Sequence, residues 1–257
     1  MSKIDQFVSE RQAQILAELQ RNGRVFAHQL AESFAVSGDT VRRDLREMAA
    51  RGECERVYGG ALLAGGTTSP LKNRLEESMD RKTALGRVAS RFFLDGMVVF
   101  IDAGSTNLAI ARCIPTNVRL TVVTNTPTIA AELSGRADIE LVVIGGRIDP
   151  AVGAAIDTTA LRQLEAVRPD LCILGACGLT LENGLTADVF EDAVFKRLAC
   201  AASLRTLAAV TTEKLGHRAA FHVHPLKAPL SLVLESDAEP HFIDRFTANR
   251  VEVYQPD

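Results

Sequence analysis

The stretch Val36-Ser37-Gly38-Asp39-Thr40-Val41-Arg42-Arg43-Asp44-Leu45 decides how the first part of the chain folds. Ser37 is a favourable N-cap residue, so a helix is predicted to begin directly after it. Val41, Leu45 and Met48 follow at helical spacing and give that helix one apolar face. The stretch therefore predicts an amphipathic helix that packs through these three side chains.

A shorter helical pattern lies just before this stretch. Its apolar residues are Ala27, Leu30, Ala31 and Phe34, and only Ala35-Val36-Ser37 separates it from the next helix. Two short helices joined by so tight a turn are typical of a helix-turn-helix motif, here over about residues 25–44.

Further elements are expected on both sides of the motif. Upstream, Ser9 and Gln12 have the spacing of a capping box, which predicts a helix that begins at Ser9 and ends at Gly23. Downstream, two short β-type runs at 53–58 and 61–64 flank a Gly-Gly pair, which predicts a small β-hairpin. Residues 1–64 are therefore predicted to form a winged helix-turn-helix, with the hairpin as the wing.

Three arginines distinguish the second helix of the motif. At about 100° per residue, Arg42, Arg43 and Arg46 project away from the apolar face. Such a local positive face suits contacts with phosphates and with guanine in the major groove, although the whole chain has a net charge of −3. The alternative is a solvated helix with ion pairs such as Asp39–Arg43. The tight turn before the helix and the hairpin after it favour DNA binding.

After a linker predicted over 65–80, short apolar runs alternate with helical stretches. The expected strands are 97–101, 120–124, 139–144, 171–174, 206–210, 230–234 and 251–254, and the expected helices are 81–94, 106–113, 126–134, 158–166 and 189–204. The runs are mostly continuous, as in strands covered on both faces. Residues 81–257 are therefore predicted to form a larger α/β domain with a mostly parallel sheet.

Polar residues follow the expected strands of this second region. In Ile101-Asp102-Ala103-Gly104-Ser105-Thr106 an apolar strand runs into a glycine and a helix start, which suits an anion but is equally typical of a helix cap. Other strand ends carry Thr124-Asn125-Thr126, Gly145-Gly146-Arg147 and Gly175-Ala176-Cys177-Gly178. Ligands of parallel sheets bind at such ends, and Lys196 and Lys214 are further candidates to reach the same cleft. Each lysine taken alone is more typical of a surface residue.

Composition excludes several other classes of protein. No apolar run approaches the roughly 20 residues of a membrane-spanning helix, and the N-terminus lacks a secretory signal, so a cytoplasmic location is expected. Five cysteines without a CxxC pair predict reduced thiols rather than disulfides or zinc. His217, His222 and His224 are the remaining metal candidates, but polar strand or loop histidines are favoured. No metal and no cofactor are therefore expected.

Two parts of the first region resemble the N-terminal signature of the DeoR family of bacterial transcriptional regulators. They are the stretch Val36–Leu45 quoted above and the later run Arg56-Val57-Tyr58-Gly59-Gly60-Ala61. The resemblance implies that Ser37, Thr40, Arg42 and Arg43 lie on DNA, with Arg46 as a weaker candidate and Arg56 and Tyr58 near backbone contacts of the wing. Tyr58 stands where histidine is frequent and Cys54 where an aliphatic residue is usual. Neither difference removes a charge that DNA binding needs.

The second region also resembles this family. The motifs D-A-G-S-T, L-T-V-V-T-N, V-I-G-G and G-L-T…D-A-x-x-K, followed by Lys214, occur in the order of its sensor domain. That domain is similar to the fold of ribose-phosphate isomerases and CoA transferases, and its members are thought to sense phosphorylated sugars or related metabolites. The effector residues that the resemblance implies are Asp102, Gly104, Ser105, Thr106, Asn125, Gly146, Lys196 and Lys214. Thr211 stands where the family often has aspartate, so the effector's identity stays open.

The expected function is therefore that of a regulator, more often a repressor in such families, that binds double-stranded operator DNA under control of a phosphorylated sugar. A homo-oligomer is expected because small DNA-binding modules commonly dimerise on symmetric half-sites. The alternative is a sugar-phosphate isomerase or CoA transferase, which Glu182-Asn183-Gly184 faintly resembles, although Asn-Gly is also a turn. No convincing acid/base constellation is present, so the prediction is that the chain is not an enzyme. A protein-interaction module is the third possibility.

Overall fold

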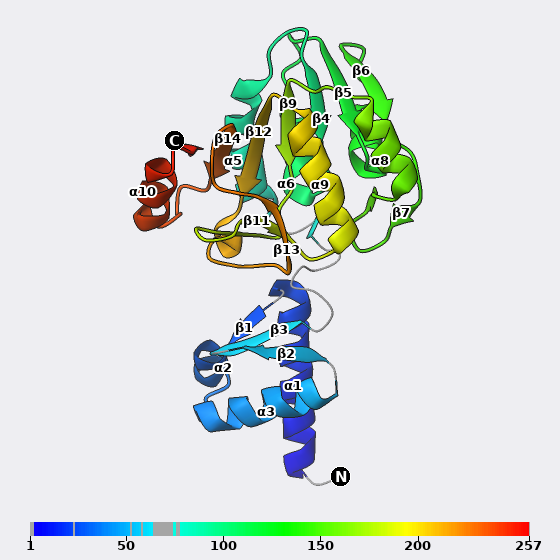
Figure 1. Ribbon diagram of the computed structural model, residues 1–257. Coiled ribbons are helices and arrows are strands. Elements are labelled where there is room, and N and C mark those ends of the chain that lie inside the picture. Colours follow the sequence, from blue (N-terminus) through cyan, green and yellow to red (C-terminus); the bar gives the residue numbers. More distant parts are fainter. Residues whose placement is uncertain are drawn as a thin grey trace. The chain divides into compact units, whose positions relative to one another are not determined.

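The computed structural model describes residues 3–22, 24–51, 53–57, 59–63, 74–75 and 78–256 (Figure 1). The chain divides into two compact units, Met1–Ser69 and Pro70–Asp257. Each unit has its own hydrophobic core.

The first unit has the winged helix-turn-helix architecture that the sequence predicts. Its helices are α1 (Lys3–Asn22), α2 (Ala27–Ser33) and α3 (Gly38–Ala50), and its antiparallel sheet has the order β1 (Arg24–Phe26), β3 (Gly60–Leu63), β2 (Cys54–Val57). The predicted cap of α3 is confirmed, because Ser37 Oγ accepts a hydrogen bond from the Thr40 amide at 3.2 Å. Val41, Leu45 and Met48 are buried together in the core of this unit.

Two features of the first unit differ from the prediction. The capping box is wrong, because α1 begins at Lys3 and Ser9 lies inside it. Gln12 instead directs its side chain toward α3, where it contacts Asp44 and Glu47. The strand β1 was not predicted, since three residues are too few for a periodic pattern. Gly23 and Tyr58 lie outside the described residues.

The second unit is built on a seven-stranded parallel sheet, which confirms the α/β fold class. The strands, in spatial order, are β15 (Glu252–Tyr254), β14 (Leu230–Leu234), β12 (Arg205–Val210), β9 (Leu171–Leu174), β4 (Val98–Ile101), β5 (Leu120–Thr124) and β6 (Ile139–Val143). Every pairing in it is parallel. The chain enters at β4, extends to β5 and β6 on one side, and then returns to β9 on the other.

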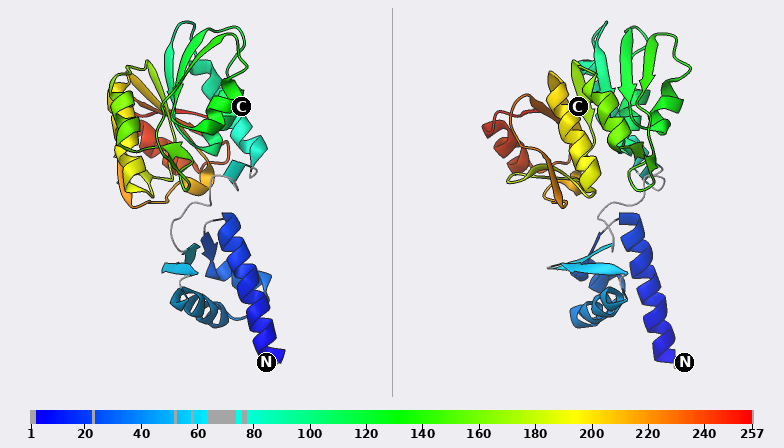
Figure 2. Two further views of the ribbon diagram at one scale, coloured as in Figure 1. Left: turned by 90° about the vertical axis from the view of Figure 1, so that its right-hand side faces the viewer. Right: turned by 45° about the vertical axis from the view of Figure 1, so that its right-hand side comes forward.

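Helices cover both faces of this sheet, as the left view of Figure 2 illustrates. On one face lie α5 (Met79–Ala89), α6 (Ser105–Arg112) and α7 (Pro127–Leu133), whose apolar residues share one core cluster. On the other lie α8 (Thr158–Glu165), α9 (Phe190–Ala202) and α10 (Pro240–Ala248), which share the second cluster. No helix among the described residues is long and apolar enough to span a membrane.

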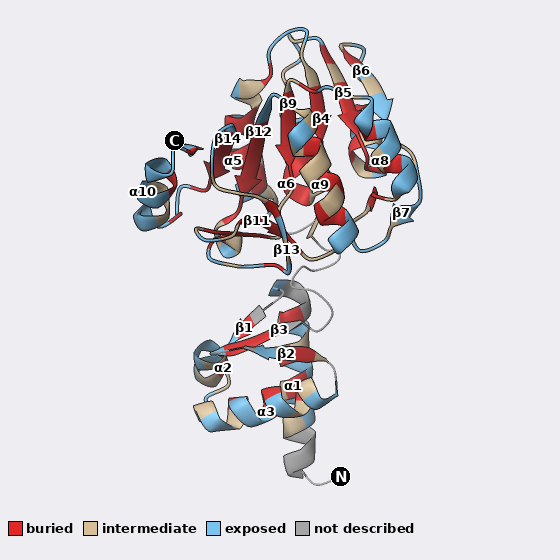
Figure 3. Ribbon diagram, viewed as in Figure 1, coloured by how far each residue is buried: buried red, intermediate tan, exposed pale blue. Residues whose placement is uncertain are grey.

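Several elements of the second unit were not predicted. These are α10, the pair β7 (Ile148–Asp149) and β8 (Ala154–Ala155), and the antiparallel sheet β10 (Gly178–Thr180), β11 (Gly184–Ala187), β13 (Phe221–His224). The helix expected over 81–94 is α5, which begins at Met79 and ends at Ala89, followed by the 3₁₀ turn η1 (Ser90–Phe92). The prediction that strands are covered on both faces is wrong for the edge strand β6, which is largely exposed in Figure 3. Val142 and Val143 of this strand are 41% and 49% exposed.

Candidate DNA interface and effector site

The arginines of α3 lie on its exposed side, as the helical projection predicts. Arg42, Arg43 and Arg46 are exposed, whereas the apolar face of the same helix is buried. Arg42 Nη1 contacts Asp39 Oδ1 at 2.6 Å, and Arg43 Nε contacts Glu47 Oε1 at 3.2 Å, in place of the Asp39–Arg43 pair considered above. Exposed ion pairs of this kind contribute little to stability. Neither pair uses all the N–H groups of its guanidinium, so both arginines keep donors for contacts with a ligand.

A cationic hollow lies beside these arginines, between α3 and the wing. Its volume is about 370 Å³, and it is lined by Ala27, His28, Arg42, Leu45, Arg56, Gly59 and Gly60. Gly60 is required by close packing, because a Cβ there would lie 1.9 Å from the Val25 carbonyl oxygen. Ser37 and Thr40 lie at the N-terminus of α3, with their hydroxyl oxygens 2.9 Å apart. The hollow and the arginine face of α3 together have the charge that a DNA backbone requires.

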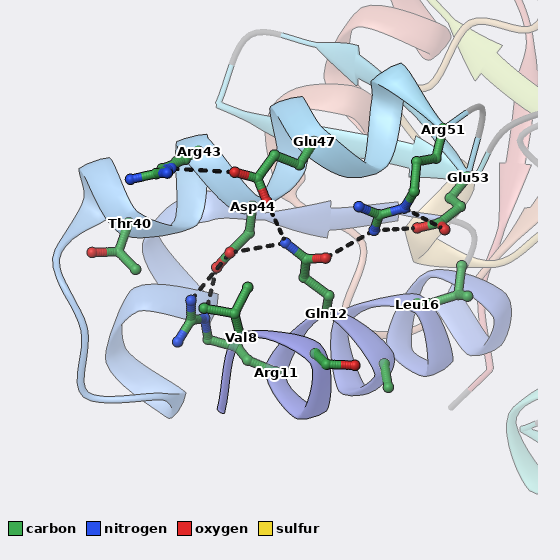
Figure 4. Close-up of a pocket in the computed structure, with 12 residues that line it drawn as sticks. Val8, Arg11, Gln12, Leu16, Thr40, Arg43, Asp44, Glu47, Arg51 and Glu53 are labelled. Atoms are coloured by element: carbon green, nitrogen blue, oxygen red, sulfur yellow. Dashed lines mark hydrogen bonds and ion pairs between the residues drawn. The ribbon is translucent and has the colours of Figure 1, made fainter. Parts of the chain in front are cut away.

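Asp44, inside the arginine motif, has a structural role that the sequence did not indicate. Its side chain is only 3% exposed and accepts hydrogen bonds from Arg11 Nε at 2.6 Å and Arg11 Nη2 at 3.1 Å (Figure 4). Gln12 Nε2 donates a third at 3.2 Å. The hydrogen bond to Asp44 raises the pKa of Arg11. These contacts fix α1 against α3 and thereby orient the arginine face.

In the second unit, polar residues gather where the parallel strands end. The residues that follow the carboxyl ends of β4, β5, β9, β12 and β14 are Asp102, Asn125, Gly175, Thr211 and Glu235. The ends of β4 and β9 flank the point at which the strand order reverses, where ligands of such sheets bind. The sequence predicted this edge from the first three of these strands.

Asp102 lies at the centre of this edge and is fully buried. Its Oδ2 accepts a hydrogen bond from the Gly175 amide at 2.9 Å and contacts Lys196 Nζ at 3.1 Å, and Lys196 also pairs with Asp192. Burial raises the pKa of Asp102. Burial alone would lower the pKa of Lys196, but the two carboxylates outweigh it and raise that pKa above its usual range. Lys196 is therefore a cation already neutralised by protein carboxylates.

Some buried polar atoms at this edge have no hydrogen-bond partner within the described part of the chain. They are Oδ1 of Asp102, Oδ1 of Asn125, Oγ1 of Thr211 and Oε1 of Glu235. The amide nitrogen of Asn125 is bound to the Ala155 carbonyl at 3.1 Å, so its oxygen faces away from that contact. Buried acceptors are normally satisfied, so these atoms suit a ligand that donates hydrogen bonds.

Gly104 is the N-cap residue of α6 and has a backbone φ of +146°, a conformation that residues other than glycine rarely adopt. The first turn of α6 contains Ser105 and Thr106, both buried, and makes no side-chain cap hydrogen bond. Instead, Asn107 Nδ2 donates to the Asp102 carbonyl at 2.9 Å and holds the turn in place. The cap interpretation of this loop therefore has no hydrogen bond to support it.

Lys214 approaches the same edge from η2 (Thr212–Lys214). Its Nζ donates to the Ala176 carbonyl at 2.8 Å, next to the Gly175 that binds Asp102. Burial lowers the pKa of Lys214 to about 8, and the charges of Arg74 and Lys82 act in the same direction. Lys82 is buried and donates to the Arg74 carbonyl at 2.6 Å. The charges of Arg74 and Lys82 therefore reach Lys214, where the nearby Glu213 carboxylate partly offsets them by raising its pKa.

Sequence reasoning missed Arg74 and Lys82. A detectable signal was present for Lys82, because it precedes Leu85 by three residues and so lies on the apolar side of α5. Gly146, in contrast, is exposed, and a Cβ there would lie 2.5 Å from Asp157 Oδ1 of the α8 cap. Packing against α8 accounts for that glycine. The structure thus brings Asp102, Lys196 and Lys214 to one edge of the sheet and explains Gly146 without a ligand.

The remaining chemical candidates have ordinary surroundings. Within the described ranges, no three His, Cys, Asp or Glu side chains come together as a metal site. His224 Nδ1 contacts the Pro225 carbonyl at 2.7 Å, and burial lowers its pKa. All five cysteines are free thiols. Asn183-Gly184 forms the turn between β10 and β11, where Gly184 has a φ of +62°.

Two family models match the chain. The DeoR-like helix-turn-helix domain matches residues 11–66, and the DeoR C terminal sensor domain matches residues 77–236. Together they span both units described above.

Individual relatives that match most of the chain agree with the two family models. The HTH-type transcriptional regulator GlpR of Haloferax volcanii is 31% identical over 212 residues, which cover 82% of this chain and 83% of that protein. The glycerol-3-phosphate regulon repressor of Escherichia coli (strain K12) is 28% identical over 212 residues, 82% of this chain and 84% of its own. Among solved structures, ribose 5-phosphate isomerase A from Methanocaldococcus jannaschii is similar with a TM-score of 0.39 and 16% identity, over 53% of this chain and 54% of that one.

Proposed function

This chain belongs to the DeoR family of transcriptional regulators, and we propose that it represses a carbohydrate-related operon under control of a phosphorylated sugar or related metabolite. The prediction of a regulator rather than an isomerase or CoA transferase is confirmed by this membership. The observation that carries the proposal is the exposed arginine face of α3, opposite a fully buried apolar face. The relative named as a glycerol-3-phosphate regulon repressor supports a phosphorylated effector.

In the proposed complex, α3 enters the major groove of double-stranded operator DNA. Arg43 and Arg46 face the bases, Ser37 and Thr40 lie at the helix end that approaches the backbone, and a phosphate occupies the hollow between Arg42 and Arg56. A regulator that binds chromosomal operators in a prokaryotic cell acts in the cytoplasm. We also propose a symmetric homo-oligomer, because an operator with two symmetric half-sites requires two recognition helices.

Loss of a phosphate contact and loss of a base contact are expected to change DNA binding in different ways. Arg56→Ala should weaken binding to every duplex and lower the slope of log affinity against log salt by about 1, because it removes a phosphate contact. Arg43→Ala should lower discrimination at one base pair by roughly 1–3 kcal/mol. Fluorescence anisotropy over a salt series measures both. Arg162→Ala, at an exposed position on α8, is the matched control and should change neither.

The general test is selection of duplexes from a random-sequence pool with the full-length chain, followed by gel shifts on the winning sequence. A regulator should enrich one motif, and an effector found in a thermal-shift screen of sugar phosphates should change the affinity for it. Enrichment of no sequence would instead favour the protein-interaction alternative.

The proposed effector makes two kinds of contact where the parallel strands end, one through its phosphate and one through its hydroxyl groups. Its phosphate is expected near Lys214, Lys82 and Arg74 and near the amides at the start of α6. Its hydroxyls are expected to donate to the unpartnered Oδ1 atoms of Asp102 and Asn125. Lys196 is proposed to position Asp102 rather than to bind phosphate, since two carboxylates already surround it. Ser105, Thr106 and Gly104 remain proposed phosphate contacts, whereas packing gives Gly146 no comparable support.

Effector affinity is expected to fall as the pH rises above 8. The free protein has a Lys214 pKa of about 8, and a bound phosphate dianion favours the protonated lysine, so binding takes up a proton at higher pH. Affinity should therefore fall about tenfold per pH unit above pH 8. The phosphate itself does not titrate there, since its second pKa is about 6.

Calorimetric titrations at pH 7, 8 and 9 test this expectation. Lys214→Arg should bind with little pH dependence, because a guanidinium stays protonated throughout the range. An affinity of the wild-type protein that stays constant to pH 9 would show that Lys214 does not contact the phosphate.

A further inference from the structure

Gln12 of α1 joins the polar residues of α3 into one hydrogen-bonded chain (Figure 4). Its Nε2 donates to Asp44 Oδ1 at 3.2 Å and to Glu47 Oε2 at 3.0 Å, and its Oε1 accepts from Arg51 Nη2 at 2.8 Å. The residue is 8% exposed. Both amide hydrogens and the amide oxygen are therefore used, which fixes the orientation of the side chain.

The chain of contacts ends at Arg43. Glu47 uses its second oxygen, Oε1, to accept from Arg43 Nε at 3.2 Å. Hydrogen bonds from Gln12 and then from Arg43 hold the pKa of Glu47 below its usual range, so it is a carboxylate at neutral pH. Within the described residues, the Nη1 and Nη2 atoms of Arg43 donate to nothing, and this side chain is 79% exposed.

This geometry leaves Arg43 with a defined free face. The guanidinium carries five N–H groups, and the one on Nε is directed toward Glu47. The four remaining groups, on the two Nη atoms, form the end-on fork that pairs with O6 and N7 of guanine. Arg42 differs, because its contact with Asp39 uses an Nη atom and so occupies that fork.

We propose that Gln12 and Glu47 are positioning residues that hold the end-on fork of Arg43 toward the base edges and so set the sequence specificity of DNA binding. The proposal rests on the proposed DNA-binding function. Gln12 acts from outside the recognition helix: it holds Glu47, and Glu47 holds Arg43 by its Nε. A long arginine side chain that is already ordered loses less conformational entropy when it pairs with a base.

The charge of Glu47 makes the proposal testable by the sign of an effect. A carboxylate close to DNA phosphates repels them, so its removal should strengthen binding to all duplexes if repulsion is its only influence. If Glu47 positions Arg43, its removal should weaken binding to the specific duplex while binding to unrelated duplexes stays equal or rises.

The experiment uses the full-length chain, the duplex selected by the wild-type protein, all its single base-pair variants and an unrelated duplex. Glu47→Ala should reduce the ratio of the affinity for the selected duplex to the affinity for the unrelated duplex about tenfold. Among the single base-pair variants, the loss of discrimination should fall at the base pair where Arg43→Ala also loses it. Adding Glu47→Ala to Arg43→Ala should reduce this ratio no further, since the residue then has nothing to position.

Three further variants separate the hydrogen bonds from charge and packing. Glu47→Gln keeps an oxygen for only one of the two donors, Gln12 Nε2 or Arg43 Nε, so it breaks the link between them and should lose part of the discrimination. Gln12→Met keeps the side-chain volume without its hydrogen bonds and should lose part of it. Glu53→Gln, which alters the Arg51–Glu53 pair at the other end of the chain of contacts, should retain all of it.

The outcomes separate this inference from the function on which it rests. If the wild-type protein selects no sequence, the proposed function fails. If it selects one and Glu47→Ala strengthens binding to every duplex equally, or leaves base discrimination unchanged, only the positioning role is overturned. Thermal unfolding of each variant identifies any loss that comes from a destabilised domain.

Discussion

Replacing Arg11 by methionine is expected to unfold the winged helix-turn-helix and abolish operator binding. The substitution leaves the Asp44 carboxylate, which is 3% exposed, without its bidentate cationic partner. Breaking a buried pair in this way costs about 3–5 kcal/mol, which is most of the stability of a domain this small. Differential scanning calorimetry of the full-length chain and gel shifts on the selected duplex measure the two consequences.

A second substitution tests the physical reason for this loss. In Arg11→Met/Asp44→Leu no buried charge remains, so this double variant should be more stable than Arg11→Met alone. Arg119→Met is the matched control, because it breaks an exposed pair with Asp95 in the other unit. It should leave the thermal unfolding of the chain and its binding to the selected duplex unchanged. An Arg11→Met protein that melts and binds DNA like the wild type would mean that Gln12 alone satisfies Asp44.

The other large effect is expected at Gly104, where valine should abolish the response to the effector. The backbone φ of +146° excludes a β-branched residue, although a Cβ itself would meet nothing closer than Asn107 at 4.0 Å. The turn must therefore change its backbone conformation, at a cost of about 1–3 kcal/mol, and the amides at the start of α6 then move from the proposed phosphate position. Thermal shift with the active sugar phosphate and gel shift with and without it measure the loss.

Gly96 supplies the control for backbone strain. It has a φ of +84°, a Cβ at this position would meet no atom within 4 Å, and the residue precedes β4 at the opposite end of the strand. Gly96→Val should lower the melting temperature but keep the effector response. A folded Gly104→Val protein that is stabilised by the effector as strongly as the wild type would exclude this loop from the site.

Local patterns predicted the elements that carry strong periodicity. The cap at Ser37, the apolar face of α3 and the exposure of its arginines depend only on residues within a few turns, and all three agree with the structure. The central strands were located correctly because strands buried on both faces are continuous apolar runs. Short elements such as β1 and β10 carry too few residues for any period, so they could not be found.

The features of the candidate sites also differ in whether local sequence was enough to predict them. The sequence by itself determined the recognition helix, the wing, the order of the strands along the chain and the polar residues at their ends, because each is encoded by neighbours in sequence. Only the tertiary structure decided that Asp44 binds Arg11, that Lys196 is neutralised by Asp102 and Asp192, and that Lys82 approaches Lys214. The energy of a charge depends on which other charges and how much water surround it, and those neighbours are brought together by packing between distant segments.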